Sequence, residues 1–485
     1  MTQSAFNSAE SFSDATISLH YQKARHLYLS SCPQIAVYDV LKCLELAPGD
    51  SYWSYRAFNL LNKICTATGW ETSDIANAIS CTAADKYLKY LVPDFIPNLT
   101  SAQASHPELN DEELEAFHES SIKDLVTGEP RLPTTNFKAP NFQFQLTDRP
   151  TSRNDIEHYE KVISENCKAR GEPQKMKIHY EDDGCGNRVI ATKTMLPGEI
   201  VYVDQDPLVW ILEDNYKRKY CSNCISTLGR ERVTCASGCT GVFYCGPTCR
   251  DEAWKNHHNI VCTSNFSRKG YVHYELSLNA QLSGELAAKC LASPNSEYHQ
   301  TPLSYSGLPY LFSLGDVATS TNSFIDKIHR SVSGTSGKGC ILHYLREYIG
   351  LVECLELDRF HASDTLHSFD FPWFVHLQLI IDPNAFTLST KKIVEAGIGL
   401  YTLAAMVNHS CESNSKFETH GLTVQILLRD NPGGIVKSGD EINIFYYPVA
   451  NMDLRSRREH LGPIYGFVCQ CNRCLQEEKL VSQPI

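Results

Sequence analysis

The stretch NHSCESN at residues 408–414 places an Asn-His pair beside a single cysteine, Cys411. A second group of cysteines follows in YGFVCQCNRC at residues 465–474. Its three thiolates, Cys469, Cys471 and Cys474, are one ligand short of the tetrahedron that zinc prefers. Cys411 can complete this set. We therefore expect one zinc ion to fasten the 408–414 turn to the C-terminal segment, which would bring two distant parts of the chain together.

The composition is that of an ordinary globular protein. Of 485 residues, 42% are hydrophobic and 21% are charged, and a chain of this length usually forms roughly two to four domains. No apolar run approaches the ~20 residues that a membrane helix requires. The opening segment MTQSAFNSAESFSDATISLH also lacks the basic and apolar regions of a secretory signal. We expect no membrane association, and a location in the reducing nucleus and cytoplasm.

Charge and cysteine content narrow the choice of partners. The formal net charge of −12 argues against direct nucleic-acid binding, because phosphate recognition relies on clustered Lys and Arg. It suits a basic protein substrate, although ordinary solubility explains it equally well. In a reducing compartment, the clustered members among the 20 cysteines indicate metal ligands rather than disulfides.

The sequence pattern predicts helices in the first part of the chain. Apolar residues recur at three- and four-residue spacing in IAVYDVLKCLEL at 35–46, with stops at Pro48-Gly49 and Gly69. Residues 1–95 are thus a helical region. It resembles one tetratricopeptide hairpin, but an unrelated helical bundle explains the same pattern. Residues 96–172 are polar and proline-containing, which is typical of a linker.

Strand patterns begin near residue 173 and return much later. The early runs are KMKIHYED, RVIATKTML and EIVYVDQDPLVWIL, and the late ones are FTLST, LTVQILLR and EINIFYY. A cysteine-dense block at 221–262 and a helical stretch at 271–379 separate the two groups. The sequence therefore predicts an α+β architecture in which one β domain is split by two insertions.

The block at 221–262 has the ligands for two closed zinc sites. Eight thiolate or imidazole groups fill two tetrahedra and leave no position for a catalytic water. The histidine is ambiguous: in DEAWKNHHNIVC, expected to be helical, His258 lies one turn before Cys262, whereas His257 is displaced by one residue. We favour His258. The candidate ligands are Cys221, Cys224, Cys235, Cys239, Cys245, Cys249, His258 (or His257) and Cys262.

This block resembles a MYND zinc finger through its cysteine pairs, FYC and WKNH. The resemblance implies interleaved pairs, with the first and third sharing one zinc ion and the second and fourth sharing the other. One departure is visible, because Cys235 to Cys239 is one residue wider than usual. Trp254 to His257 would have the family's tryptophan-to-histidine spacing, which favours the other histidine. The choice between His257 and His258 stays open.

Four other motifs, in their joint order, resemble a SET-domain lysine methyltransferase. They are GCGNRVIATKTMLPGEIV at 184–201, NHSC at 408–411, GDEINIFYY at 439–447 and the Cys-x-Cys-x2-Cys tail. With the inserted finger, the chain is similar to the SET and MYND domain (SMYD-type) family, and its long N-terminal region resembles the fungal histone-methylating branch. This implies a SET domain at 173–447, interrupted by a MYND finger at 221–262 and a helical insert at 271–379, and a post-SET zinc-binding tail at 448–485.

The resemblance also implies residue roles. Tyr446 stands in the position of the catalytic tyrosine, and Tyr401 and Tyr465 would wall the lysine channel. S-adenosylmethionine would be the cofactor, beside three structural zinc ions, two in the finger and one in the tail. The residues that would bind S-adenosylmethionine are Gly186, Asn187, Asn384, Asn408, His409, Tyr446 and Phe467.

Taken singly, these residues have ordinary explanations. A tyrosine at a strand end is typically a half-buried core aromatic, and an Asn-His pair is typical of a turn. Asp440 and Glu441 look like a catalytic carboxylate pair, but neighbouring strand residues face opposite sides, so we interpret them as turn and strand-entry residues. Arg188 and Ser413 replace a glycine and a proline that the family usually has.

The resemblance implies a protein-lysine N-methyltransferase whose substrate is a histone tail, with the H-four histone favoured by the fungal branch. Two alternatives stay open. The substrate can be a lysine on a non-histone protein, or the chain can be an interaction scaffold with little activity, in which the MYND finger captures Pro-rich peptides.

Overall fold

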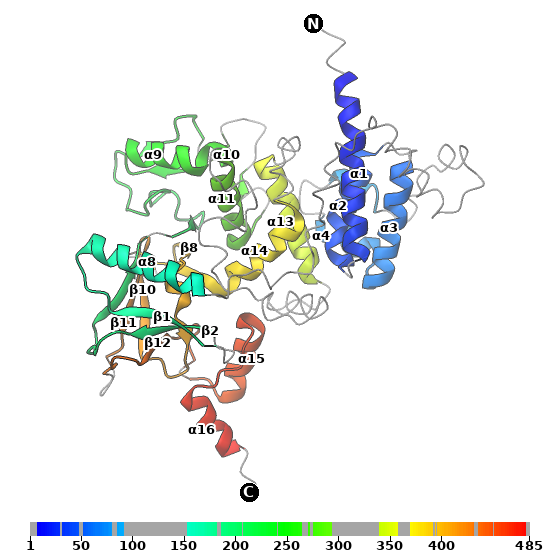
Figure 1. Ribbon diagram of the computed structural model, residues 1–485. Coiled ribbons are helices and arrows are strands. Elements are labelled where there is room, and N and C mark those ends of the chain that lie inside the picture. The colour runs from blue at the N-terminus through cyan, green and yellow to red at the C-terminus, as the bar shows by residue number, and fades with distance from the viewer. Residues whose placement is uncertain are drawn as a thin grey trace. The chain divides into compact units, whose positions relative to one another are not determined.

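The computed structural model describes residues 7–29, 32–47, 52–79, 85–91, 153–181, 186–205, 207–239, 241–263, 270–271, 275–292, 339–356, 369–390, 393, 395–430, 435–449 and 451–481. The chain divides into two compact units, each described here by itself (Figure 1). The first is Met1–Leu146 with Thr319–His329 and Gly334–Ile349, and the second contains the remaining residues. None of the described helices is both long and apolar enough to cross a lipid bilayer.

The first unit is helical where it is described, in the region expected to be so. Its helices are α1 (Asn7–Leu29), α2 (Pro33–Leu46), α3 (Tyr52–Thr68), α4 (Thr72–Ile79) and α5 (Asp85–Leu88). Helix α2 begins with proline in its first turn and is buried along Ile35–Leu44, between α1 and α3. The fully buried Asp39 lies 2.7 Å from His20 and 3.6 Å from Lys23, so its charge is paired.

The second unit contains the predicted split β domain. One sheet has the strand order β1-β2-β12-β9. A second has the order β10-β11-β3, and a third β4-β8-β7. Strands from before and after the insertions are therefore neighbours. The strands are β1 (Met176–Glu181), β2 (Gly186–Ala191), β3 (Ile200–Asp204), β4 (Val209–Leu212), β7 (Ala385–Leu388), β8 (Gly397–Leu400), β9 (Asn408–His409), β10 (Ser415–His420), β11 (Thr423–Leu428) and β12 (Glu441–Ile444).

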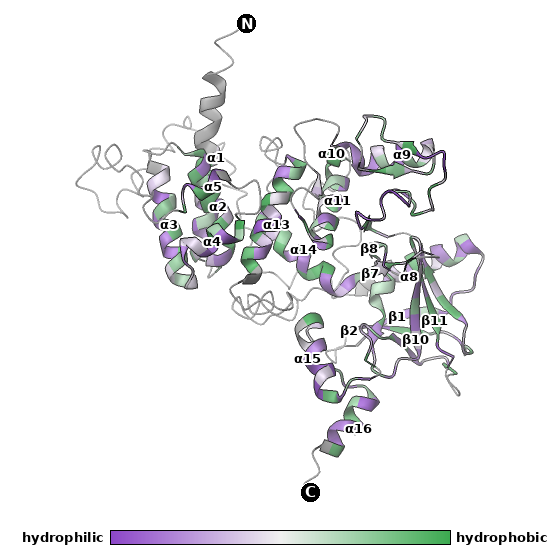
Figure 2. Ribbon diagram, turned by 180° about the vertical axis from the view of Figure 1, so that it is seen from behind, coloured by the Kyte–Doolittle hydropathy of each residue, from purple (hydrophilic) through white to green (hydrophobic). Residues whose placement is uncertain are grey.

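Buried and more exposed residues alternate along the strands, so the core lies on one side of them. Along β11 every second residue is buried, and hydrophobic and hydrophilic residues occur together along β10 and β11 (Figure 2). Val424, Ile426 and Leu428 point into the core of the domain, which they share with Val189 of β2 and Ile442 of β12. One continuous apolar core thus holds the sheets together.

The NHSCESN stretch is held at both ends by β12. Strand β9 pairs parallel with β12, with Asn408 opposite Asn443 and His409 opposite Ile444. At the other end, the Asn414 backbone N–H donates to Asn443 Oδ1 (3.1 Å), and the Asn443 N–H donates to Asn414 Oδ1 (3.1 Å). These reciprocal bonds fix the turn against the strand that leads to Tyr446.

The expected linker at 96–172 contains a helix. Residues 96–152 of this segment lie outside the described part, but Arg153–Arg170 form helix α8, which was not predicted from the sequence. Its buried residues Tyr159, Ile163 and Cys167 join the core of the β domain, and Asn166 Nδ2 donates to Tyr202 Oη at 2.6 Å. The mean hydropathy of α8 is low, so its apolar face is narrow and was hidden among charged residues.

The second insertion is helical over the parts that the structure describes, as expected. Helices α11 (Leu278–Ala292) and α14 (Phe371–Asn384) contact each other, and α13 (Gly339–Leu355) lies between them in sequence. Asp370 caps α14 by accepting the Trp373 N–H at 2.8 Å. Because α14 runs directly into β7, it delivers Asn384 to the edge of the β domain.

Candidate functional site

One cluster of four cysteines, the third along the chain, brings together residues that are 58 positions apart, Cys411 and Cys469. Its members are Cys411, Cys469, Cys471 and Cys474. The Cys411 sulfur lies 3.7 Å from that of Cys469 and 3.6 Å from that of Cys474, and Cys471 completes the set. A zinc tetrahedron with Zn–S bonds of about 2.3 Å has edges of about 3.8 Å, whereas a disulfide needs about 2.05 Å. The cluster therefore fits zinc.

Two helices shape the C-terminal side of this cluster. Helix α15 (Leu454–Tyr465) ends at Gly466, whose φ of 77° belongs to the left-handed region that favours glycine. The reversal directs Phe467 and Cys469 back toward Cys411. Helix α16 (Asn472–Val481) then carries Cys474. The fully buried Arg457 of α15 donates to Cys474 Sγ at 3.5 Å and to Glu477 at 2.8 Å, so it brings a positive charge beside the thiolates.

The zinc-finger block forms two further clusters, paired as the resemblance implied. Cys221, Cys224, Cys245 and Cys249 form one, and Cys235, Cys239, His258 and Cys262 form the other. Sulfur separations of 3.6 Å for Cys224–Cys245 and 3.7 Å for Cys235–Cys262 again match tetrahedron edges. Short strands β5 (Val233–Thr234) and β6 (Phe243–Tyr244) connect the ligands.

The histidine in the finger is selected by an irregular helix. The segment expected to be a regular helix is instead α9 (Pro247–Ala253), a π turn at Trp254–His258 and α10 (Asn259–Val261). A π turn contains one residue more than an α turn. It places the buried His258 with Nε2 3.3 Å from Cys239 Sγ, while His257 Nε2 lies 3.5 Å from Glu285 Oε2 of α11.

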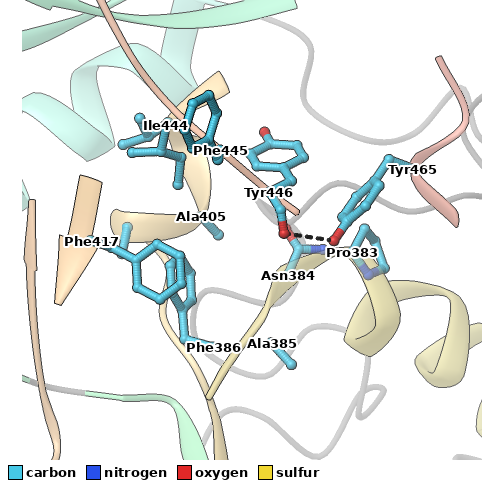
Figure 3. A pocket seen from close by; sticks show the side chains of 12 residues that line it. Pro383, Asn384, Ala385, Phe386, Ala405, Phe417, Ile444, Phe445, Tyr446 and Tyr465 are labelled. Atoms are coloured by element: carbon cyan, nitrogen blue, oxygen red, sulfur yellow. Dashed lines mark hydrogen bonds between the residues drawn. The ribbon is translucent and has the colours of Figure 1, made fainter. Parts of the chain in front are cut away.

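A small cavity of about 60 Å³ is lined in part by Phe445 and Tyr465, which also pack against the third cluster (Figure 3). Its wall is aromatic and apolar, with two predicted site tyrosines at one side. The Tyr446 and Tyr465 rings are 5.0 Å apart, and Tyr465 Oη donates to the Tyr446 carbonyl oxygen at 3.3 Å. The lining residues are Pro383, Asn384, Ala385, Phe386, Ala404, Ala405, Val407, Phe417, Ile444, Phe445, Tyr446 and Tyr465.

Burial keeps both tyrosine hydroxyls protonated. It raises the pKa of Tyr446 well above the usual value of 10, with further contributions from Tyr465 and the Glu441 carboxylate. The pKa of Tyr465 rises to about 12, mainly through burial and secondarily through Asp382. At neutral pH both side chains are therefore neutral hydroxyl dipoles rather than phenolate charges.

The Asn408 side chain links three strands. Its Nδ2 donates to the Asn187 carbonyl oxygen of β2 at 2.9 Å and to Glu441 Oε1 of β12 at 3.0 Å. Both amide protons are used, and among the described residues Oδ1 accepts no hydrogen bond. The predicted site residues Asn187 and Asn408 are therefore brought together, with an acceptor oxygen left for a ligand.

The His409 imidazole is held at both nitrogens. Nδ1 accepts the backbone N–H of Tyr446 at 3.1 Å, and Nε2 lies 3.3 Å from Cys411 Sγ. Burial lowers the pKa of His409 to about 4, so the ring is neutral. Phe467, expected to stack on adenine, is half-buried, with its ring 5.9 Å from that of His409.

Gly186 and Asn384 lie at the ends of their elements. Gly186 begins β2 opposite Glu181, and the cofactor turn before it, with Cys185, falls outside the described residues. Asn384 ends α14, lines the cavity and donates from Nδ2 to the Ile380 carbonyl at 2.7 Å.

Tyr401 does not lie where it was expected, in the wall of the lysine channel. It is fully buried in the core, packs edge-on against Phe386 and donates to the Leu422 carbonyl at 2.7 Å. It does not line the cavity. Tyr401 directly follows β8, the middle strand of its sheet, and its ring therefore packs in the hydrophobic core.

Other cavity residues were missed by sequence reasoning. Phe386 had a detectable signal, because it begins the predicted strand FTLST and lies close in sequence to the predicted site residue Asn384. Phe417 lines the cavity from β10, and the centroid of its ring lies 5.1 Å from that of Phe386, edge-on. No local sequence pattern predicts this contact, because the two residues come from different strands. Glu441 was interpreted as a strand-entry residue, yet its side chain holds Asn408.

No protein-family model matches the sequence. The chain is 25% identical over 294 residues to mouse "Histone-lysine N-methyltransferase SMYD3", covering 61% of this chain and 60% of the relative. It is 29% identical over 273 residues to a Dictyostelium discoideum "SET and MYND domain-containing protein", covering 53% and 71%. It is 23% identical over 357 residues to the fungal "Histone-lysine N-methyltransferase SET5" of Eremothecium gossypii, covering 66% and 65%.

Among solved structures, the SET domain of LSMT bound to lysine and AdoHcy aligns with 64% of this chain and 56% of its own, at 12% identity and a TM-score of 0.31. That likeness is too low to carry an argument. The chain spans about 60% of the length of the mouse and human SMYD3 proteins. The matched relatives, the interleaved finger clusters and the cluster that joins Cys411 to the C-terminal cysteines agree: this chain is a relative of the SMYD-type SET and MYND domain proteins.

Proposed function

We propose that this protein is an S-adenosylmethionine-dependent protein-lysine N-methyltransferase. The observation that carries the proposal is the small aromatic cavity lined by Tyr446 and Tyr465, together with the His409–Tyr446 hydrogen bond and the packing of Tyr465 against the Cys411 cluster. When bound, S-adenosylmethionine supplies a methyl group on a sulfonium. Transfer to an amine is an in-line displacement, so alignment of donor and acceptor is the main task of the protein.

The donor and acceptor groups around the cavity suit that cofactor. Asn408 Oδ1 is an acceptor for the ammonium of its methionine portion, and the start of β2 at Gly186-Asn187 lies beside it through the Asn408–Asn187 bond. Asn384, the last residue of α14, also lines the cavity. The remaining polar contacts would come from the backbone of Asn408-His409, with Phe467 providing an aromatic surface for the adenine.

The cavity wall suits a lysine side chain. Phe386, Phe417 and Phe445 offer apolar contact to methylene groups. Burial in such a wall lowers the pKa of an amine and favours the unprotonated form, which is the nucleophile. The Tyr446 hydroxyl, which keeps its proton, then orients the amine.

For the substrate we propose a basic protein segment, with a histone tail first and the H-four histone as the initial candidate. Support comes from the names of the relatives and from the net charge of −12. A relative from Xenopus laevis is named "N-lysine methyltransferase SMYD2-A", so a non-histone lysine is the second candidate. Capture of Pro-rich peptides by the finger and a nuclear and cytoplasmic location stay proposals.

The test uses zinc-loaded full chain, labelled S-adenosylmethionine and core histones, with mass spectrometry to locate the label. We expect lysine labelling by the wild type, and a fall of about a hundredfold for Tyr446→Phe at nearly unchanged cofactor affinity, because one oriented hydroxyl is lost. Tyr447→Phe is the matched control, since Tyr447 is exposed and stacks on His460. Absence of cofactor binding by wild-type protein in calorimetry contradicts the proposal.

A further inference from the structure

We propose that the His409 side chain is a positioning residue that ties the third zinc cluster to Tyr446, rather than a ligand of the cofactor. The inference rests on the proposed function for its kinetic readout. It is carried by two hydrogen-bond distances at opposite nitrogens of one buried ring.

The first bond holds the segment that carries Tyr446. The parallel β9–β12 ladder ends at the His409–Ile444 pair, where the Ser410 N–H donates to the Ile444 carbonyl at 3.1 Å. Tyr446 lies two residues beyond, outside the strand. Its N–H is satisfied by His409 Nδ1 instead of by a strand partner. The imidazole thus extends the ladder by one bond and sets where the Tyr446 main chain leaves the sheet.

The second bond reaches the metal cluster. With zinc bound, the Cys411 sulfur is a thiolate and can only accept a hydrogen bond. Nε2 must then carry the ring proton, which leaves the Nδ1 lone pair free to accept the Tyr446 N–H. The two bonds therefore demand the same ring orientation, and each supports the other. Outer-shell partners of this kind orient metal ligands in many sites.

These bonds leave the side chain no polar atom for the cofactor. The ring is also flanked by Tyr446 at 5.4 Å and by Phe467 at 5.9 Å, between ring centroids. A cofactor contact at this position would have to use the His409 backbone. The sequence resemblance assigned cofactor binding to His409 without distinguishing the side chain from the main chain, and the geometry points to the main chain.

Two substitutions separate the bonds. In His409→Asn the side-chain oxygen takes the place of Nδ1 and can accept the Tyr446 N–H, but it does not reach Cys411. In His409→Gln the side-chain amide takes the place of Nε2 and can donate to Cys411, but nothing accepts the Tyr446 N–H. Each variant is compared with wild type in zinc content, zinc release to a chelator, cofactor affinity by calorimetry, and kcat.

We expect His409→Gln to lower kcat by about tenfold or more with zinc release close to wild type, since one oriented bond to the catalytic segment is lost. We expect His409→Asn to release one zinc per chain several-fold faster, with a smaller loss of kcat. Cofactor affinity should change by less than about threefold in both, because no side-chain contact is removed.

A fall in cofactor affinity as large as the fall in kcat would overturn the inference and make His409 a side-chain ligand. Equal effects of both variants on zinc release and kcat would overturn it as well, because the two bonds would not be separable. If wild-type protein neither binds cofactor nor transfers methyl, the proposed function fails. The positioning role is then decided by zinc release alone, which must still be faster in His409→Asn than in His409→Gln.

Discussion

At the residue scale, Glu441 holds the side chain of another predicted site residue, Asn408. Its carboxylate accepts from Asn408 Nδ2 at 3.0 Å, and this bond fixes which way the Asn408 amide points. The neighbouring Asp440 has a different task, because its Oδ2 accepts the Lys437 N–H at 2.7 Å and closes the turn before β12. Of these two adjacent carboxylates, that of Glu441 holds Asn408 and that of Asp440 closes a turn.

We expect Glu441→Ala to weaken S-adenosylmethionine binding by about tenfold, because Asn408 loses a charge-assisted bond and can rotate. Glu441→Gln should weaken it much less, since its carbonyl oxygen still accepts. Asp440→Ala is the control, and it should lower thermal stability while leaving cofactor affinity near that of wild type. Calorimetric titration of the three variants checks this, and equal affinities for Glu441→Ala and wild type would contradict it.

The two adjacent histidines of the finger have separate roles. We expect His258→Ala to reduce bound zinc from three ions to two per chain, because one tetrahedron loses a ligand. His257→Ala should keep all three ions, since its partner is Glu285. Atomic absorption on the purified variants measures both. Loss of zinc from His257→Ala with retention in His258→Ala would reverse the assignment.

At the scale of elements, α11 carries a buried ionisable group against the finger. Burial raises the pKa of Glu285 to about 7 from its ordinary 4.5, although Lys217, Lys289 and Tyr271 favour the charged form. The His257 ring also faces it, from the π turn. Because the carboxyl group is protonated more readily when folded than when unfolded, the folded state binds more protons between these two pH values.

The contribution of Glu285 to stability is therefore fully present below about pH 4.5 and is lost as the pH rises toward about 7. We expect Glu285→Gln to flatten the dependence of the unfolding midpoint on pH across this window. Urea unfolding at several pH values measures the slope. Glu252→Gln, at a residue on the outside of the finger that accepts from Asn223 Nδ2, is a matched control and should leave the slope unchanged. An unchanged slope in Glu285→Gln would contradict the expectation.

At the scale of the whole molecule, the β domain is closed by its C-terminal segment through the third cluster. Cys411 lies in the NHSCESN stretch, while Cys469 and Cys474 come from the segment after α15. The apolar residues that pack around them, Val449 and Leu461, form a small core of their own. Such a small core needs an additional constraint, which a metal supplies.

We expect Cys474→Ser to lower the zinc content by one ion and to abolish cofactor binding, because α15 and Tyr465 lose their attachment to the β domain. Cys354→Ser is the control: this buried cysteine lies in α13, outside the three clusters, and should leave three zinc ions bound. Metal analysis combined with calorimetry checks both. A Cys474→Ser variant that binds two ions and cofactor at wild-type affinity would show that closure is not required.

From the sequence alone, the candidate ligand residues, the split β domain and the motifs of the site were predictable, because spacing, alternation and residue type are local properties. How the finger ligands pair was implied by the family resemblance. The sequence left the finger histidine open, since a π turn depends on how a helix is packed. Helix α8, the core position of Tyr401 and the reach of Phe417 into the cavity were decided only by the tertiary structure. So was the dual bonding of His409, because its partners come from a neighbouring strand end and a metal cluster. Which side of a buried ring meets which partner is set by packing among distant segments, and no local pattern encodes it.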